Sequence, residues 1–410
     1  MNWDVIVVGG RCSGAPTAML LARQGHKVLV VDKATFPSDV PYSTHLLHVR
    51  GSAYLKKWGL LDRLAQSGCP PMRKMLLDFG AVTITGGPPP VEGVADTYAP
   101  RRFIFDKILV DAAREAGVEI REGFSVDEIL MEGTTVVGIK GKDASGKVVE
   151  ERARVVVGAD GTQSKVAQAV GAKKYNTREP KVMTYFAYWS GVSIEPGFDL
   201  EFHPRVGLCS YAWPTHNNQV LIGANWLVSE LPRIKQNPEA HYMDVLKKCS
   251  PRLAERVAAG KRETEFVGGA TENFLRESAG PGWALVGDAG ANYEFASGQG
   301  ITNGFRAADL LAAALHDGLS GQRPMPEALA QYQKDRDAGD VPYYDFTYKQ
   351  MTLGSAPPTK IFQAIAASPE WSSMFLGVIA EAVAPSTFFG PGNMLKILFA
   401  SVFGAKKKAA

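Results

Sequence analysis

The sequence of 410 residues has few cysteines and no long apolar run. Its four cysteines, Cys12, Cys69, Cys209 and Cys249, lie far apart and form no C-x-x-C pair, so neither a disulfide framework nor a zinc site is expected. No Cys/His cluster has the spacing of metal ligands, and we expect no metal. No apolar stretch is long enough to cross a bilayer. The first predicted strand begins almost at Met1, so we expect no signal peptide and a cytoplasmic protein.

An excess of charge of one sign is also lacking. The 45 lysines and arginines nearly balance the 42 acidic residues, and the formal net charge is +3. Basic residues are scattered except at 406–408, so no phosphate-binding stripe and no nucleic-acid partner are predicted. With 45% hydrophobic and 21% charged residues, the composition is typical of a soluble globular enzyme with two or three domains.

The first 33 residues carry the signature of a dinucleotide site. An apolar strand over 5–8 runs into a glycine turn and then a helix, and a second strand over 28–32 ends in Asp32. The helix start points amides at a pyrophosphate, and Asp32 can accept a hydrogen bond from a ribose hydroxyl. Arg11 stands where G-x-G-x-x-G has its second glycine, and we expect it to contact or flank the pyrophosphate. The predicted cofactor contacts here are Gly9, Gly10, Arg11, Cys12, Ser13, Gly14, Asp32 and Lys33.

Two later strands also end in acidic turns. The strand over 153–157 leads to Asp160 and Gly161, and the strand that begins at Trp283 leads to Gly287 and Asp288. In open parallel sheets, ligands bind beyond the carboxyl ends of strands, so each acid is placed for a cofactor. Asp160 is equally well explained as the cap of the following helix, and Asp288 as a turn residue.

In this order and spacing, the three motifs resemble the flavoprotein monooxygenase superfamily with the p-hydroxybenzoate hydroxylase fold. That group includes flavin-dependent halogenases and geranylgeranyl reductases, and the resemblance covers residues 1 to about 345. It implies FAD, with its pyrophosphate on the first motif and its hydroxyls near the third. It also places the arginine of the segment 102–109 on the cofactor and residue 126 near adenine. The further cofactor contacts that the resemblance implies are Thr44, His45, Arg102, Val126, Asp160, Gly161, Gly287, Asp288, Gly298, Gly300 and Ile301.

The predicted fold class is α/β, with interleaved domains. An FAD-binding Rossmann-like domain of the p-hydroxybenzoate hydroxylase type alternates with a mostly antiparallel β-sheet substrate domain, and a helical C-terminal segment follows. The predicted ranges are 1–73, 101–177 and 275–342 for the FAD domain, 74–100 and 178–274 for the sheet domain, and 343–410 for the helical region. The apolar segment 394–403 could lie on an anionic membrane surface, but packing against the protein or a second subunit is favoured.

The third motif departs from the family pattern. The family often has histidine where this chain has Ala291, and proline where it has Phe295, beside the flavin face at which oxygen reacts. The catalytic lysine and the Trp-x-Trp-x-Ile-Pro signature of halogenases are not evident, so halogenation is not expected. For His48 a structural role is favoured over acid–base chemistry.

The resemblance predicts an NAD(P)H-dependent monooxygenase that hydroxylates or epoxidises an apolar or aromatic small molecule through a flavin C4a-hydroperoxide, with NADH or NADPH as electron donor. One alternative is a reductase of isolated C=C bonds, like the geranylgeranyl reductases, which the residue at 295 keeps open. The other is a flavin-binding protein without turnover. The candidate catalytic residues are His45, Tyr293, Glu294 and Phe295, and the candidate cavity residues are Tyr185, Tyr211, Trp213, Pro214 and Phe295.

Overall fold

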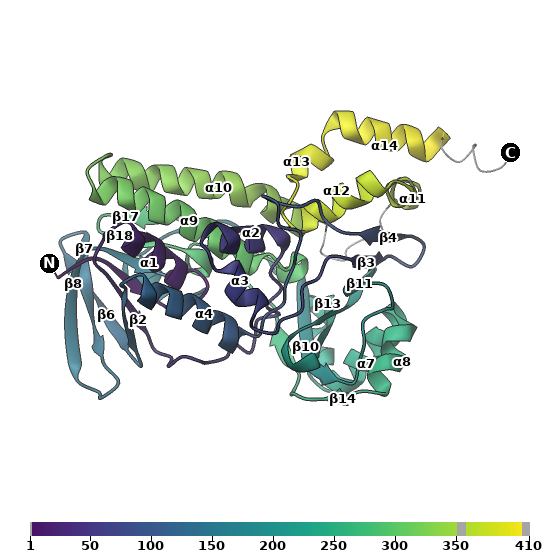
Figure 1. The fold of residues 1–410 in the computed structure, drawn as a ribbon, viewed down its shortest axis with the longest axis horizontal. Helices are drawn as coiled ribbons and strands as arrows, with labels where there is room; N and C mark the ends of the chain where they lie inside the picture. The colour runs from purple at the N-terminus through teal and green to yellow at the C-terminus, as the bar shows by residue number, and fades with distance from the viewer. Residues whose placement is uncertain (1, 351–357, 404–410) are drawn as a thin grey trace.

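The computed structural model describes residues 2–350 and 358–403. Two large sheets lie toward opposite ends of an elongated molecule, and two long helices run along one side (Figure 1). The two sheets draw their strands alternately from the sequence, so the chain crosses between the two halves several times.

The first eight-stranded sheet has the path β17-β18-β8-β1-β2-β5, and a β6–β7 hairpin extends from β8. Neighbours among β18, β8, β1, β2 and β5 pair in parallel. The strands are β1 (Trp3–Val8), β2 (Val28–Asp32), β5 (Glu119–Glu122), β6 (Ser125–Glu132), β7 (Thr135–Lys142), β8 (Val148–Gly158), β17 (Ala279–Gly280) and β18 (Trp283–Leu285). Because β1 and β2 are buried on both faces, they read as continuous apolar runs.

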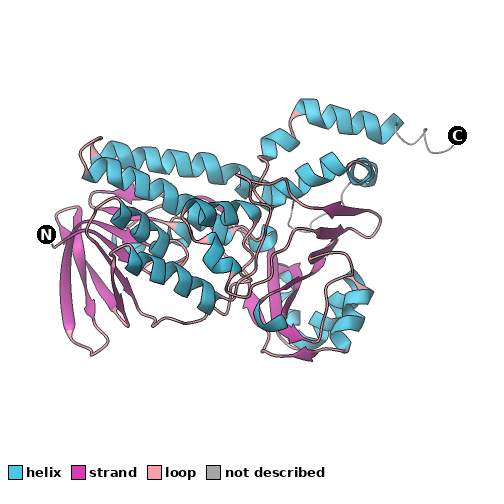
Figure 2. Ribbon diagram, in the orientation of Figure 1, coloured by secondary structure: helices cyan, strands magenta, loops and turns pink. Residues whose placement is uncertain are grey.

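Most helices of this half cover one face of this sheet, while the short α5 and the β6–β7 hairpin pack on the other (Figure 2). The helices of this half are α1 (Gly14–Arg23), α2 (Val49–Lys57), α3 (Leu61–Ala65), α4 (Arg102–Glu115), α5 (Lys165–Ala169), α9 (Gly300–Leu319) and α10 (Met325–Gln350). The apolar stripe of α9 packs against α1, α2 and α10, so its start is held above the end of β1.

The second eight-stranded sheet has the path β14-β10-β13-β12-β11-β3-β4, with β15 beside β10. Every pairing in it is antiparallel except β11 with β3. Its strands are β3 (Met75–Asp78), β4 (Thr83–Gly86), β10 (Val182–Ser190), β11 (Leu200–Arg205), β12 (Leu208–Pro214), β13 (Val220–Leu227), β14 (Lys261–Arg262) and β15 (Val267–Gly269). A small third sheet joins β19 (Ala291–Asn292), β16 (Asn273–Arg276) and β9 (Lys174–Arg178).

Helices cover the two faces of the second sheet differently. One face packs against α7 (Pro238–Cys249) and α8 (Pro251–Ala258), which follow the short α6 (Leu231–Ile234). The other face packs against the C-terminal helices. These helices are α11 (Thr359–Ala367), α12 (Pro369–Ile379), α13 (Pro385–Phe388) and α14 (Pro391–Phe403).

The predicted fold class is confirmed, since parallel α/β and antiparallel segments interleave as expected. One predicted boundary, at residue 342, falls inside α10 rather than between elements. That helix continues past Pro342 while packing along α9, so the nucleotide half and the C-terminal region share one element.

Glycine permits the closest approach in the first sheet. A Cβ added to Gly14 would lie 1.8 Å from the carbonyl oxygen of Gly9, and one added to Gly9 would lie 2.5 Å from the carbonyl oxygen of Ala159. Any side chain at Gly14 would therefore push α1 away from the turn that ends β1.

We expect Gly14→Ala to lower the free energy of unfolding by about 2–4 kcal/mol, because the backbone must move to relieve the clash. Urea unfolding followed by circular dichroism measures this loss. Gly392→Ala is the matched control, because an added Cβ there meets nothing within 4 Å. Equal stability of the two variants would contradict the close packing of α1.

A buried charge network ties β3 to β11. The ring of His203 lies 2.9 Å from a carboxylate oxygen of Glu201 through Nε2 and 3.4 Å from Asp78 through Nδ1. Arg205 and Arg256 pair with these same two carboxylates. Burial alone would lower the pKa of His203, but its hydrogen bonds to Asp78 and Glu201 outweigh burial and raise the pKa above its usual 6.5.

Protonated His203 should therefore stabilise the fold at low pH. Its contribution is complete below the unfolded-state pKa, near 6.5, and is lost as the pH rises through the higher folded-state value. We expect His203→Gln to be less stable than the parent by about 1–3 kcal/mol at pH 6, with the gap narrowing at alkaline pH. Unfolding curves across this pH range test it, and a gap that widens with pH would refute it.

Candidate cofactor site

Asp32 closes the turn between β1 and α1. It is 8% exposed, and its carboxylate accepts hydrogen bonds from the amides of Gly10 at 2.7 Å and Ala34 at 2.8 Å. The structure therefore places this carboxylate at the carboxyl edge of the sheet, beside the glycine turn, where the sequence motif puts it. Lys33 follows it with an exposed side chain.

Three chain segments converge on Ser13 at the start of α1. A Cβ on Gly287 would lie 2.1 Å from the Ser13 hydroxyl oxygen, and one on Gly304 would lie 2.6 Å from it. Gly287 also has a φ of +62°, which favours glycine. The first and third motifs, more than 270 residues apart, thus meet around one hydroxyl.

The side chain of Arg11 is engaged within the protein. Its guanidinium pairs with Asp106 at 2.7 Å and donates to the Ser38 hydroxyl at 2.8 Å. The expected contact between Arg11 and the pyrophosphate stays a prediction. Asp106 and Ser38 would compete with the pyrophosphate for the Arg11 guanidinium. The Cys12 thiol donates to the same carboxylate at 3.3 Å, and burial raises its pKa, so it is held as a neutral thiol.

Arg102 also converges on Asp106. Its guanidinium donates to both carboxylate oxygens of Asp106, at 2.9 and 3.1 Å, and to the Ser43 hydroxyl at 3.1 Å. Burial alone would lower the pKa of Arg102, but the Asp106 carboxylate that pairs with it raises the pKa above its usual value. Asp106, which is fully buried, was not predicted as a site residue, although it lies in the segment 102–109 whose arginine the resemblance places on the cofactor.

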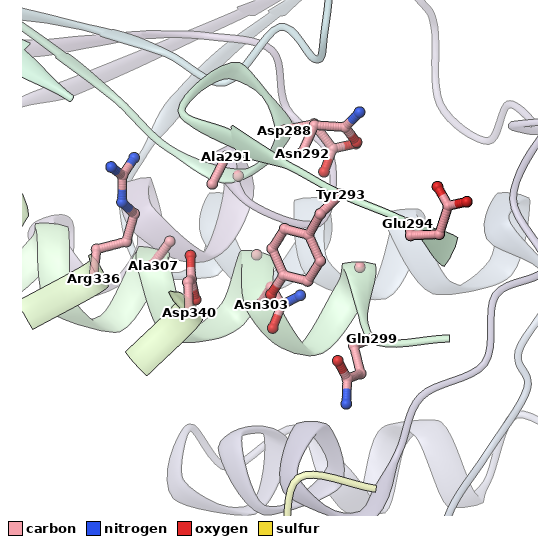
Figure 3. A pocket seen from close by; sticks show the side chains of 13 residues that line it. Asp288, Ala291, Asn292, Tyr293, Glu294, Gln299, Asn303, Ala307, Arg336 and Asp340 are labelled. Atoms are coloured by element: carbon pink, nitrogen blue, oxygen red, sulfur yellow. The ribbon is translucent and has the colours of Figure 1, made fainter. Parts of the chain in front are cut away.

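Asp288 stands in a recess formed by its own loop, α9 and α10 (Figure 3). Its side chain is exposed within this recess. The protein atoms around the carboxyl limit its hydration and so raise its pKa, while the positive charge of Arg102 acts to lower that pKa. At the start of α9, Gly300 is exposed, and a Cβ added there would meet nothing within 4 Å. Open space therefore lies in front of the free amides of a 20-residue helix, beside an acid.

Asp160 accepts hydrogen bonds from the first turn of α5, but the N-cap residue of that helix is Ser164, so the expectation that Asp160 is the cap is corrected. One carboxylate oxygen accepts the amide of Lys165 at 2.7 Å at the start of α5, while the other is buried with no hydrogen-bond partner among the described residues. The Lys165 ammonium in turn donates to the carbonyl of Val126 at 2.6 Å, which joins two predicted cofactor positions. Gly161, at φ +77°, lies in the turn between Asp160 and α5.

The loop before α2 links the nucleotide half to the second sheet. His48 donates through Nε2 to the Ser297 carbonyl at 2.7 Å, and burial lowers its pKa to about 4 despite that carbonyl. His45, at φ +45°, lies 2.8 Å from the Tyr188 hydroxyl. Burial, then Arg101, holds the pKa of His45 well below its usual range, so both imidazoles are neutral at physiological pH.

The predicted catalytic residues of the loop before α9 face different surroundings. Glu294 accepts hydrogen bonds from the amides of Lys181 and Val182, and these bonds join the loop to β10. Burial raises the pKa of the Glu294 carboxyl. Tyr293 lies in the recess beside Asn303 and Asp340 (Figure 3). Phe295 begins the single turn η4 (Phe295–Ser297), half-buried ahead of Gly298.

Aromatic side chains gather on the face of the second sheet opposite α7 and α8. Tyr211 stacks on Trp213 with ring centres 4.8 Å apart, and Gly223 leaves room for the Tyr211 ring. The Trp213 indole donates to the carbonyl of Thr44 at 3.3 Å, which ties this aromatic face to the cofactor loop. Pro214 follows, half-buried, at the end of β12.

Tyr185 does not share that face. Its ring packs edge-on against Trp226, on the side of the sheet that α7 and α8 cover. Side chains alternate along β10, so Phe186 and Tyr188 point to one face and Tyr185 to the other. The prediction that Tyr185 lines the same cavity as Tyr211 is therefore corrected, because Tyr185 lies on the opposite face; Tyr188 shares the face of Tyr211 and lies 2.8 Å from His45.

Residues 2–340 match the family described as FAD binding domain, and the chain belongs to that family. Tryptophan 2-halogenase of Chondromyces crocatus is 26% identical over 353 residues, which are 80% of this chain and 64% of that protein. Digeranylgeranylglycerophospholipid reductase of Methanosarcina acetivorans is 24% identical over 341 residues, covering 82% of this chain and 80% of that protein. Among solved structures, the probable FAD-dependent monooxygenase PqsL of Pseudomonas aeruginosa shares the fold with a TM-score of 0.72 at 21% identity, over 89% of this chain and 100% of that one.

We expect Asp288→Ala to weaken FAD affinity by about 1.5–3 kcal/mol, because a hydrogen bond to a charged group is lost. Fluorescence titration of the apoprotein with FAD measures this change. Asp335→Ala, an exposed acid on α10, is the control and should bind FAD as the parent does. Full FAD affinity in Asp288→Ala would show that the carboxylate does not touch the cofactor.

Proposed function

We propose that this chain is an FAD-dependent monooxygenase that draws electrons from NADH or NADPH and inserts one oxygen atom into an apolar or aromatic small molecule. The other atom of O2 leaves as water, and one NAD(P)H and one proton are consumed in each turnover. Family membership supports the cofactor, and the surroundings of the site support the class of substrate.

The residues present fit FAD. The turn at Ser13, which Gly287 and Gly304 approach closely, would offer backbone amides to the pyrophosphate. Asp32, beside Gly10, would accept a hydrogen bond from a ribose hydroxyl. Asp288 and Arg102 would hold hydroxyls of the ribityl chain. The open start of α9 would meet the pyrimidine edge of the flavin, because its first amides lack partners within the helix.

When bound and reduced, FAD supplies the two electrons that activate oxygen. The amides of Gly300 and Ile301, with the positive end of the α9 dipole, stabilise negative charge at that edge. The neutral imidazole of His48 positions the turn before α9 through its bond to Ser297. None of these roles requires a charged acid or base.

The single observation that carries the proposal is the aromatic wall joined to the cofactor loop. Tyr211 and Trp213 stack on the sheet, and Trp213 and Tyr188 bond to Thr44 and His45 of that loop. A substrate held here would lie against apolar and aromatic surface beside the start of α9. Such surroundings would exclude water, and the exclusion of water limits side reactions that consume NAD(P)H without forming product.

Reduction of an isolated C=C bond is the second candidate, and Phe295 is the observation that favours it. A bulky ring at the start of η4, where the resembled family often has proline, can exclude oxygen as well as water. One relative is named as a reductase of geranylgeranyl lipids. Another is named as a halogenase, but the halogenase signature is not evident here and halogenation is not proposed.

The deciding experiment reduces the purified yellow protein with NADH or NADPH without oxygen and then adds oxygen and candidate aromatic or isoprenoid substrates. Mass spectrometry distinguishes a product gaining 16 mass units, one oxygen atom, from a product gaining two hydrogens. Oxygen incorporation from labelled O2 supports the monooxygenase. Hydrogenation without oxygen incorporation overturns it in favour of the reductase.

We expect Phe295→Pro to lower the ratio of product formed to NAD(P)H consumed by at least about twofold, because the ring that excludes water is lost. Hydrogen peroxide release should rise in parallel. Phe79→Leu is the control, since Phe79 packs on Phe362, outside η4. A ratio that increases in Phe295→Pro would show instead that the ring blocks oxygen.

A further inference from the structure

The helix α14 is apolar on two sides, of which one packs against the protein and the other is largely exposed. Ile397 is fully buried, and Met394 and Ala400 are partly buried against the C-terminal core beside α11. The opposite side, which we call the outer face of α14, is exposed. It consists of Leu395 at 55%, Leu398 at 41%, Phe399 at 62% and Val402 at 62% exposure.

The spacing of the outer face makes it a single stripe. Its residues recur at steps of three and four, so they line one side of the helix, and α14 lies at the edge of the molecule (Figure 1). Single exposed apolar residues are ordinary, but a contiguous stripe marks a surface that contacts something apolar.

Charge identifies the partner. Residues 382–410 contain four lysines, Lys396, Lys406, Lys407 and Lys408, and no acidic residue. Lys396 lies on α14 itself with an exposed side chain, and the other three follow the helix in the sequence. An apolar stripe flanked by basic residues fits a surface that is apolar within and anionic at its boundary.

We propose that the outer face of α14 lies on the surface of an anionic lipid bilayer. Among the described residues, no helix is long and apolar enough to cross a membrane. A helix of 13 residues lying in the interface would sink its apolar stripe among the acyl chains, while Lys396 and the three lysines that follow the helix in the sequence meet anionic headgroups.

A second copy of the chain is the competing occupant, and charge argues against it. In a two-fold interface the same patch meets itself, so the basic segments of two copies would be brought together. No acid between residues 382 and 410 is available to compensate. Anionic lipid compensates this charge directly, and this difference favours the bilayer.

The surface proposal makes one structural link to the proposed function. The helix α14 packs on α11, and α11 and α12 pack against the sheet that carries Tyr211 and Trp213. Membrane contact would therefore bring the aromatic face of the protein toward the bilayer, where apolar molecules collect. Vesicle binding itself needs no turnover, so the two proposals fail independently.

The test is co-sedimentation of the full chain with vesicles of phosphatidylcholine alone or of phosphatidylcholine mixed with phosphatidylglycerol. We expect binding to the anionic vesicles that weakens with added salt, and little binding to neutral ones. The double variant Leu398→Asp/Val402→Asp should lower the partition coefficient about tenfold or more. Replacing Lys406, Lys407 and Lys408 with alanine should lower it by about fivefold per lysine.

Val206→Asp is the matched control, because Val206 is 61% exposed in the turn between β11 and β12 and lies far in sequence from α14. It should bind vesicles as the parent does, and circular dichroism should show all variants folded. Absence of binding to anionic vesicles, or binding that the α14 variants leave unchanged, overturns the proposal. So does light scattering that shows a dimer which Leu398→Asp/Val402→Asp converts to a monomer.

Discussion

The close approach of backbone around the Ser13 hydroxyl is the constraint on which the cofactor site depends. Gly287 and Gly304 can reach that hydroxyl only because neither has a side chain, and Gly14 packs against Gly9 for the same reason. These contacts bring together the ends of β1 and β18 and the first turns of α9. The amides and carboxylates of three distant motifs therefore share one edge of one sheet, which no single motif could form alone.

Buried ion pairs then fix where that edge lies relative to the rest of the molecule. Asp106 accepts from both Arg11 and Arg102, and removing the carboxylate would leave the buried Arg102 guanidinium without this ionic partner in the interior. On α9, Arg306 pairs with Asp340 and Glu381, while the Gln299 amide donates to the carbonyl of Ile379 at 2.9 Å. The C-terminal helices thus hold the helix start that would face the flavin, so they belong to the functional unit.

The titratable groups near the site are arranged to stay uncharged or engaged. Burial keeps the His45 and His48 imidazoles neutral, and the Glu294 carboxylate accepts a hydrogen bond from the amide of Val182 at the start of β10. The start of α9 itself borders a recess with oriented amides and the Asp288 carboxylate, while Tyr211 and Trp213 lie on the second sheet and connect to the cofactor loop through Thr44. A bound redox cofactor would supply the chemistry in that environment, and the exclusion of water would limit its side reactions.

The sequence by itself determined the nucleotide half, because strands buried on both faces and glycine turns leave local patterns: β1, β2 and the turn at Gly14 lie where the motifs predict. Interleaved domains followed from alternating strand and helix periods. Only the tertiary structure decided the rest. It gave the acid partner of Arg11, placed Tyr185 on the far face of β10, and ran α10 through the predicted boundary. These outcomes depend on which segments distant in sequence meet, and a side chain acquires its partner only when the chain folds.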